Sequence, residues 1–327
     1  MIGSFRQRPE WIAIALIAIL SGCAAHPPQA AFQDATHLPT RSEIEQTPFY
    51  KQEQYQCGPA ALATALSASG VIVEPEELAA EVYLPGRKGS LQVELAAAAR
   101  ARDRVAYTLA PRLTDLLEQV AAGNPVLLMQ NLGLKLLPAW HFAVLVGYDR
   151  DAQTVILRSG TTPRLAMDVQ RFMRTWDRAQ RWAILILPPD RLPAHPELDR
   201  YMAAVASLES TGRLDAAERA YLQARGQWPQ SVWPALGLAN VSYARGELRK
   251  AETGYLDSLA LDPQNVVAHN NLSEILLERG CVTQARSHIE RATQLAKGTS
   301  LEVPVASTAR HIAAASAQDS GASCPQP

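Results

Sequence analysis

Cys57 has the sequence surroundings of a nucleophilic thiol. It is followed by Gly58 and Pro59, and then by a run rich in alanine and leucine that reaches Gly70. Proline suits the first turn of a helix and glycine commonly ends one, so the pattern predicts a helix that begins near Cys57 and ends before Gly70. The positive end of a helix dipole favours the thiolate, so we expect the pKa of Cys57 to be lowered. The alternative is a small buried hydrophobic residue at a helix start.

A thiol nucleophile needs a base, and His141 has the context that suits this role. The chain has 7 histidines, and the others lie beside prolines or in predicted helices. His141 opens an apolar run that reaches Asp149 and predicts a buried strand, and a second strand over 154–157 follows a short turn. A histidine at the first position of a strand can point into a cleft. The other interpretation is a histidine that only hydrogen-bonds the backbone at a strand end.

These two motifs resemble one known family. The motifs are a glutamine, Gln52, ahead of Cys-Gly-Pro-Ala-Ala-Leu, and later His-x-Ala-Val-x-Val-Gly-Tyr-Asp beginning at His141. The combination resembles the C39-like, papain-like cysteine peptidases, which include the double-glycine leader peptidases of bacteriocin exporters. The resemblance spans about residues 45–190 and implies an α+β papain-like fold, a protein or peptide substrate and no cofactor.

The resemblance also implies roles for individual residues. Cys57 would attack the carbonyl carbon, and His141 would serve as base and then as acid. The side chain of Gln52, together with the backbone N–H of Cys57, would form the oxyanion hole, in which two donors stabilise the charge that develops on the substrate oxygen. Gln52 lies five residues before Cys57, one fewer than in exporter-type members, so the hole either uses a shortened loop or is imperfect.

The third catalytic position departs from the family. Its members usually have Asp or Asn on the strand after the histidine, whereas this chain reads Arg-Ser-Gly-Thr over 158–161. If the hairpin turns around 150–151, His141 lies opposite Gly160 and next to Ser159, which makes Ser159 our candidate for orienting the ring. A hydroxyl can fix the ring but cannot stabilise an imidazolium as a carboxylate does, so weak activity or none is the alternative.

The C-terminal part of the chain repeats itself. Gly212, Gly246 and Gly280 are each 34 residues apart. Other columns repeat with the same spacing: Ala217, Ala251 and Ala285; Tyr221, Tyr255 and Ile289; and Pro229 with Pro263. This period resembles tetratricopeptide repeats and predicts an all-α solenoid of three repeats over 197–298, followed by a cap and tail over 299–327. Its groove could hold a peptide partner, with Asn240, Asn270 and Asn271 as candidate contacts, or the array could be a spacer or a dimerisation surface.

The N-terminus predicts export. Two basic residues precede an apolar run over 12–20, which is too short to cross a bilayer, and Leu-Ser-Gly-Cys ends at Cys23. This ending resembles a bacterial lipobox, so residues 1–23 are predicted to be a lipoprotein signal peptide with Cys23 acylated. The alternative is an ordinary secretory signal. Ala24 after the cysteine indicates the outer membrane facing the periplasm, and 24–44 then has the composition of a tether.

Cys281 and Cys324 are the cysteines that neither acylation nor catalysis uses. In an oxidising compartment free thiols are disfavoured, so a disulfide between them is predicted. No Cys-x-x-Cys pair or histidine cluster accompanies them, and no zinc site is expected.

Lys and Arg (31) nearly balance Asp and Glu (32), which leaves no bulk attraction to nucleic acid. Hydrophobic residues at 47% exclude a wholly disordered chain.

Together these features predict a lipid-anchored cell-envelope cysteine peptidase. An α+β papain-like peptidase domain over 45–190 would be followed by a linker over 191–196 and by an all-α tetratricopeptide-repeat solenoid that selects a protein or peptide partner. The competing prediction is a catalytically inactive peptidase-fold scaffold or peptide-binding lipoprotein.

Overall fold

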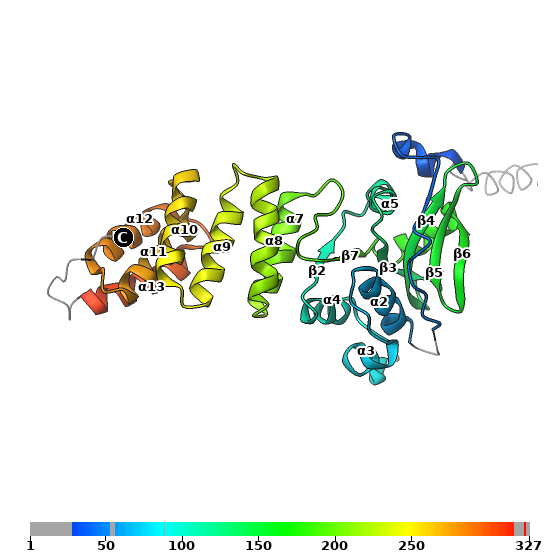
Figure 1. Ribbon diagram of the computed structural model, residues 1–327, viewed down its shortest axis with the longest axis horizontal. Coiled ribbons are helices and arrows are strands. Elements are labelled where there is room, and N and C mark those ends of the chain that lie inside the picture. Colours follow the sequence, from blue (N-terminus) through cyan, green and yellow to red (C-terminus); the bar gives the residue numbers. More distant parts are fainter. Residues whose placement is uncertain (1–27, 53–55, 88, 317–323, 325–327) are drawn as a thin grey trace, which may run out of the picture.

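The computed structural model describes residues 28–52, 56–87, 89–316 and 324. Within these residues it consists of a mixed α/β domain and an array of helices that extends away from one side of it (Figure 1). Cys23 and the predicted signal peptide lie outside the described residues. None of the described helices is long and apolar enough to cross a membrane.

The N-terminal domain is built on a seven-stranded sheet. Strands follow one another in the order β2-β7-β3-β4-β5-β6, all these neighbours pair antiparallel, and β1 pairs with the far end of β4. The strands are β1 (Arg41–Glu43), β2 (Val105–Thr108), β3 (Val126–Asn131), β4 (Trp140–Asp149), β5 (Thr154–Ser159), β6 (Thr162–Asp168) and β7 (Ala183–Leu187). The central strands are continuous apolar runs because helices cover both faces of the sheet.

Two groups of helices enclose the sheet. One face packs against α2 (Cys57–Ala68), α3 (Pro75–Val82) and α4 (Gln92–Ala101). The other packs against α5 (Leu113–Ala121), α6 (Val169–Asp177) and the short 3-10 helix η2 (Pro28–Ala35). A second 3-10 turn, η3 (Pro85–Arg87), precedes α4. This is the α+β architecture that the sequence predicted.

The prediction of a tether over 24–44 is wrong for its described part. Phe32 and Ala35 of η2 are 4% and 1% exposed and belong to the core. Phe32 packs against Tyr148 with ring centroids 6.5 Å apart, and Arg41 opens strand β1, which pairs with β4. The sequence around these residues is rich in proline and polar groups, and the few apolar side chains that anchor it gave too weak a pattern to recognise.

The C-terminal region contains three helix pairs and one further helix. They are α7 (Leu198–Ser210) with α8 (Leu214–Gln227), α9 (Val232–Ala244) with α10 (Leu248–Leu261), α11 (Val266–Glu278) with α12 (Val282–Ala296), and α13 (Glu302–Ser316). Gly212, Gly246 and Gly280 stand between the two helices of each pair with φ of +75°, +75° and +74°. Glycine adopts this left-handed conformation without a Cβ penalty, which explains why it recurs at this position. The predicted tetratricopeptide solenoid is therefore confirmed as a fold.

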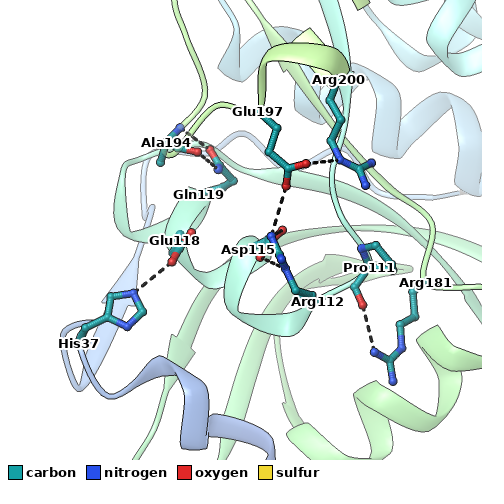
Figure 2. A network of polar contacts seen from close by, with 10 residues as sticks. All are labelled: His37, Pro111, Arg112, Asp115, Glu118, Gln119, Arg181, Ala194, Glu197 and Arg200. Carbon is teal, nitrogen blue, oxygen red and sulfur yellow. Dashed lines mark hydrogen bonds and ion pairs between the residues drawn. The ribbon is translucent and has the colours of Figure 1, made fainter. Parts of the chain in front are cut away.

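The segment between the two regions is tied to the N-terminal domain. Residues 188–197 form no helix or strand, as the prolines predicted. Gln119 of α5 donates through Nε2 to the Ala194 carbonyl at 2.7 Å and accepts from the Ala194 N–H at 2.9 Å, and Arg112 pairs with Glu197 at 3.2 Å (Figure 2). Tyr201 of α7 is fully buried in the same hydrophobic cluster as the sheet. The array thus begins as part of the N-terminal core.

Candidate active site

Cys57 is the first residue of α2, as predicted. It is the free cysteine among the described residues and is partly exposed, while the helix behind it is buried from Gly58 to Leu66. A Cβ atom on Gly58 would collide with the side chain of Ser90, so glycine at this position lets the chain before α4 approach the helix start closely. The nucleophile candidate therefore sits on a rigid, tightly packed element.

The electrostatics of Cys57 correct one prediction. Burial raises the pKa of the Cys57 thiol, and the backbone N–H groups of Phe142, Gly58 and Cys57 itself lower it by less than burial raises it. The expected lowering of the pKa by the helix terminus is therefore outweighed by burial. The same contacts are informative about position, because they place the sulfur beside the backbone of Phe142 at the start of β4.

His141 forms a side-chain hydrogen bond with Ser159. The distance between His141 Nε2 and Ser159 Oγ is 2.8 Å, and Ser159 is 7% exposed at the end of β5. Burial lowers the pKa of His141, so the imidazole is neutral at pH 7. The pairing arises from a register other than the predicted one: Asp149 pairs with Thr154, and a bulge follows between Leu145 and Gly147. Ser159 still ends beside His141.

Gln52 lies at the same strand end. Its Nε2 donates to the Phe142 carbonyl oxygen at 3.4 Å, a long hydrogen bond, and its backbone N–H donates to Gly160 at 3.0 Å. β5 pairs with β4 only as far as Val144, so the edge of β4 beyond that residue is open to other partners. Gln52 and Cys57, which are five residues apart in the sequence, thus both contact the backbone of one distant residue, Phe142.

The Cys57 sulfur and His141 both lie at the start of β4, but their side chains are not hydrogen-bonded to each other. No hydrogen bond between them occurs in the described part of the chain. Side chains alternate along β4: Phe142 and Val144 pack on the α2 side, whereas Ala143 packs on the opposite side, to which His141 belongs by the same alternation. His141 is the second residue of the strand and directly precedes Phe142, whose backbone lies beside the Cys57 sulfur.

The main chain of Phe142 is the part of the site that sequence reasoning missed. Its side chain is 2% exposed and packs edge-on against Trp182, with ring centroids 5.8 Å apart. A buried phenylalanine in an apolar strand carries no chemical signal, because its contribution here is a backbone N–H and a carbonyl. Only its position directly after His141 could have drawn attention to it.

The residues predicted for the repeat array have partners of their own. Asn240 Oδ1 accepts from the Tyr255 hydroxyl at 2.7 Å and from Asn271 Nδ2 at 3.2 Å, so these asparagines tie α9, α10 and α11 together.

The structure joins Cys281 and Cys324 in a disulfide with a Cα–Cα distance of 4.6 Å. No group of three or more His, Cys, Asp or Glu side chains suited to a metal ion occurs among the described residues.

Two family models match parts of this chain, and several solved structures resemble parts of it. Residues 44–184 match the model of the Peptidase C39 like family, and residues 255–287 match a tetratricopeptide repeat model. A crystal structure of a C39-like peptidase from Bacillus anthracis is similar, with 19% identity, a TM-score of 0.38, and coverage of 45% of this chain and 97% of that one. The type III secretion translocator chaperone SycD of Yersinia enterocolitica is similar with 18% identity, a TM-score of 0.34, and coverage of 37% and 86%. None of the curated proteins matches the chain.

Proposed function

We propose that this chain, in which a C39-like peptidase domain is followed by tetratricopeptide repeats, is a cysteine peptidase that hydrolyses peptide bonds. Cys57 is the nucleophile, and His141 is the base and then the acid. The side chain of Gln52 and the backbone N–H of Cys57 are the donors of the oxyanion hole.

The observation that carries this proposal is the convergence on Phe142. Gln52 Nε2 contacts its carbonyl, the Cys57 sulfur lies near its N–H, and His141 precedes it in the strand. A nucleophile, a base and an amide donor at one strand end are the groups that acyl transfer requires. The long bond from Gln52 is a weak one, so a substrate oxygen can take its place.

The protonation states define the order of events. With Nε2–H of His141 donating to the Ser159 hydroxyl, the lone pair of Nδ1 is free to accept the Cys57 proton. Because burial raises the pKa of Cys57 and lowers that of His141, the resting pair is neutral. The proton then moves from the Cys57 thiol to Nδ1 of His141 as the sulfur attacks the carbonyl carbon. The imidazolium returns that proton to the departing amine, and water hydrolyses the thioester.

A peptide-mixture experiment tests the proposal. The wild-type chain is incubated with a mixed-sequence peptide library, and new termini are identified by mass spectrometry. Cys57→Ala should produce none above background. The matched control is Cys281→Ala with Cys324→Ala, which removes the other described cysteines and should still cleave. Equal cleavage by wild type and Cys57→Ala would exclude the assigned nucleophile.

A second candidate function is non-catalytic peptide binding. Two observations favour it: a serine hydroxyl replaces the carboxylate or amide beside the histidine, and burial disfavours the Cys57 thiolate because it raises the pKa. In that case the library would be bound but not cut, and Cys57→Ala would bind it as well as the wild type does.

The repeats and the N-terminus complete the proposal. We assign to the repeat array the selection of a protein or peptide partner, and to Cys23 an acyl anchor in the outer membrane on its periplasmic side. The anchor is supported by the lipobox-like run that ends at Cys23. Membrane fractionation of wild type and Cys23→Ser tests it, and a soluble wild-type protein would contradict it.

A further inference from the structure

Arg158 is a buried cation whose hydrogen bonds all reach backbone carbonyls. It is 8% exposed, in the β5 position just before Ser159. Its Nη1 donates to Pro163 at 2.7 Å, its Nη2 to Glu45 at 3.0 Å and its Nε to Thr47 at 3.2 Å. Among the described residues, no carboxylate accepts a hydrogen bond from this guanidinium. Removing a charged group from water costs folding free energy unless its N–H donors find acceptors. The three carbonyls supply such acceptors, so their positions show what this buried guanidinium holds in place.

The three carbonyls belong to two separate stretches of chain. Pro163 lies on β6, directly after the turn that follows Ser159, while Glu45 and Thr47 lie on the segment that connects β1 to α2. Arg158 follows Ile156 on the face of the sheet that packs against α2. The fork-shaped guanidinium therefore holds residues 45–47 across that face and fastens them to the β5–β6 hairpin.

The fastened segment leads directly to Gln52. Thr47 is five residues before it, and the backbone N–H of Gln52 is bonded to Gly160, in the turn of the same hairpin. The segment carrying the amide donor is thus attached to the β5–β6 hairpin at two places, by Arg158 at Thr47 and by the backbone at Gln52. The same hairpin carries Ser159, the partner of His141.

We infer that Arg158 is a positioning residue of the candidate active site, because it clamps the 45–52 segment to the β5–β6 hairpin and so sets where the Gln52 amide points relative to Cys57. This inference rests on the proposed function for its catalytic consequence. Its geometric part, the clamp on residues 45–52, can be measured without any turnover.

A double-mutant cycle tests the catalytic consequence on the full chain, with a peptide found in the library experiment as the probe. Gln52→Ala should lower kcat by ~10²-fold, the usual effect of losing one oxyanion donor. Arg158→Gln should lower kcat by a similar factor with little change in KM, and the double variant should be no worse than Gln52→Ala alone. If the fold-losses in kcat of the two single variants multiply in the double variant, Arg158 acts independently of Gln52 and the inference is overturned. An Arg158→Gln effect that appears in KM instead of kcat would overturn it as well.

Two further variants separate positioning from folding. Arg164→Ala is the matched control: this arginine lies on the same hairpin and contacts the same N-terminal segment through Glu43 at 2.8 Å, but it is exposed. It should leave kcat unchanged. If Arg158→Gln does not fold, Arg158→Lys replaces it in the cycle, since it keeps the charge but cannot reach three carbonyls at once.

Hydrogen exchange distinguishes a failure of this inference from a failure of the proposed function. In Arg158→Gln the Gln52 amide, bonded to Gly160, should exchange faster than in the wild type, and in Arg164→Ala it should not. If the wild type cleaves nothing, the proposed function fails, and this measurement still decides whether the clamp exists. Unchanged exchange in Arg158→Gln overturns the inference in either case.

Discussion

The two regions of this molecule assemble their important contacts in different ways. In the repeat array each helix packs mainly on its sequence neighbours, and the same glycine conformation recurs between the helices of each pair, at Gly212, Gly246 and Gly280. In the N-terminal domain the candidate site brings Gln52 and Cys57, which are close in the sequence, together with the distant strand end at 141–142. Local rules repeated three times are enough for the first region. The second depends on sheet pairings between distant strands.

The two regions are nevertheless not independent bodies. Tyr201 of α7 packs against Tyr107 of β2 and against Trp228 after α8, with ring centroids 6.3 Å and 5.9 Å apart. The hydrophobic cluster that contains the sheet continues into α8 and reaches Val241 of α9. One hydrophobic core therefore continues across the boundary between the N-terminal domain and the repeats. The first repeat is part of that core as well as of the repeat array.

The largest expected effect is a loss of peptide turnover on substitution of His141, which lies in the N-terminal domain. His141→Ala removes the proposed base and should lower turnover by ~10⁴-fold, as losses of a catalytic base do. Thermal unfolding should change little, because His141 is only half-buried at a strand end and its side chain bonds to one residue, Ser159. The measurement is kcat with the library peptide beside a melting curve. Retained turnover would remove His141 from the mechanism.

Tyr201→Ala tests the shared core. The side chain is fully buried between the regions, so its loss should cost about 3–5 kcal/mol of unfolding free energy, the range for large aromatic truncations. Denaturant unfolding followed by tryptophan fluorescence should still show one transition, shifted to lower denaturant. Arg200→Ala, which loses an exposed pair with Glu197, is the control and should shift it little. Two separated transitions in the wild type would show that the regions unfold independently.

The disulfide lies in the periodic region, far along the chain from the candidate site. It closes a loop between α12 and the tail, with a sequence separation of 43 residues, and a loop of this length is worth about 4 kcal/mol at most in the chain-entropy model. Reduction, or Cys281→Ser with Cys324→Ser, should therefore lower the unfolding temperature of the chain. Peptide turnover at Cys57 should stay the same. Loss of turnover on reduction would show coupling from the end of the array to the site.

The pH dependence of turnover gives the smallest effect and the finest test of the site. Burial lowers the pKa of His141 below its ordinary value, so the neutral base is present at pH 7 and turnover should fall only once the pH drops below about 6.5. Ser159→Asp places a carboxylate beside the ring, raises the pKa of His141 and should move the acid limb to higher pH by about one unit. Ser159→Ala should leave that limb near its wild-type position. If Ser159→Asp does not shift the pH at which turnover falls, Ser159 is not the hydrogen-bond partner of the His141 ring during catalysis.

Particular residues show how far sequence reasoning could go. The helix at Cys57 followed from Pro59 and Gly70, and Ser159 was identified beside His141 even though the assumed register was wrong, because near neighbours on a hairpin survive a shift by a residue or two. The core contacts of Phe32 were missed, since one aromatic residue in a polar stretch has no period. The direction of the Cys57 pKa shift was also missed, because it depends on how deeply the thiol is buried.

The sequence by itself determined the parts that local chemistry and periodicity encode: the 34-residue repeat with its turn glycines, the helix that begins at Cys57 and the apolar strand that carries His141 near its start. Tertiary structure decided which backbone these residues share, that Arg158 reaches the segment carrying Gln52, and that the first repeat joins the core of the sheet. The physical reason is that hydrogen bonds to main-chain groups and burial depend on which distant segments meet. A main-chain N–H or carbonyl is the same at every residue and carries no sequence signal until a fold selects its partner.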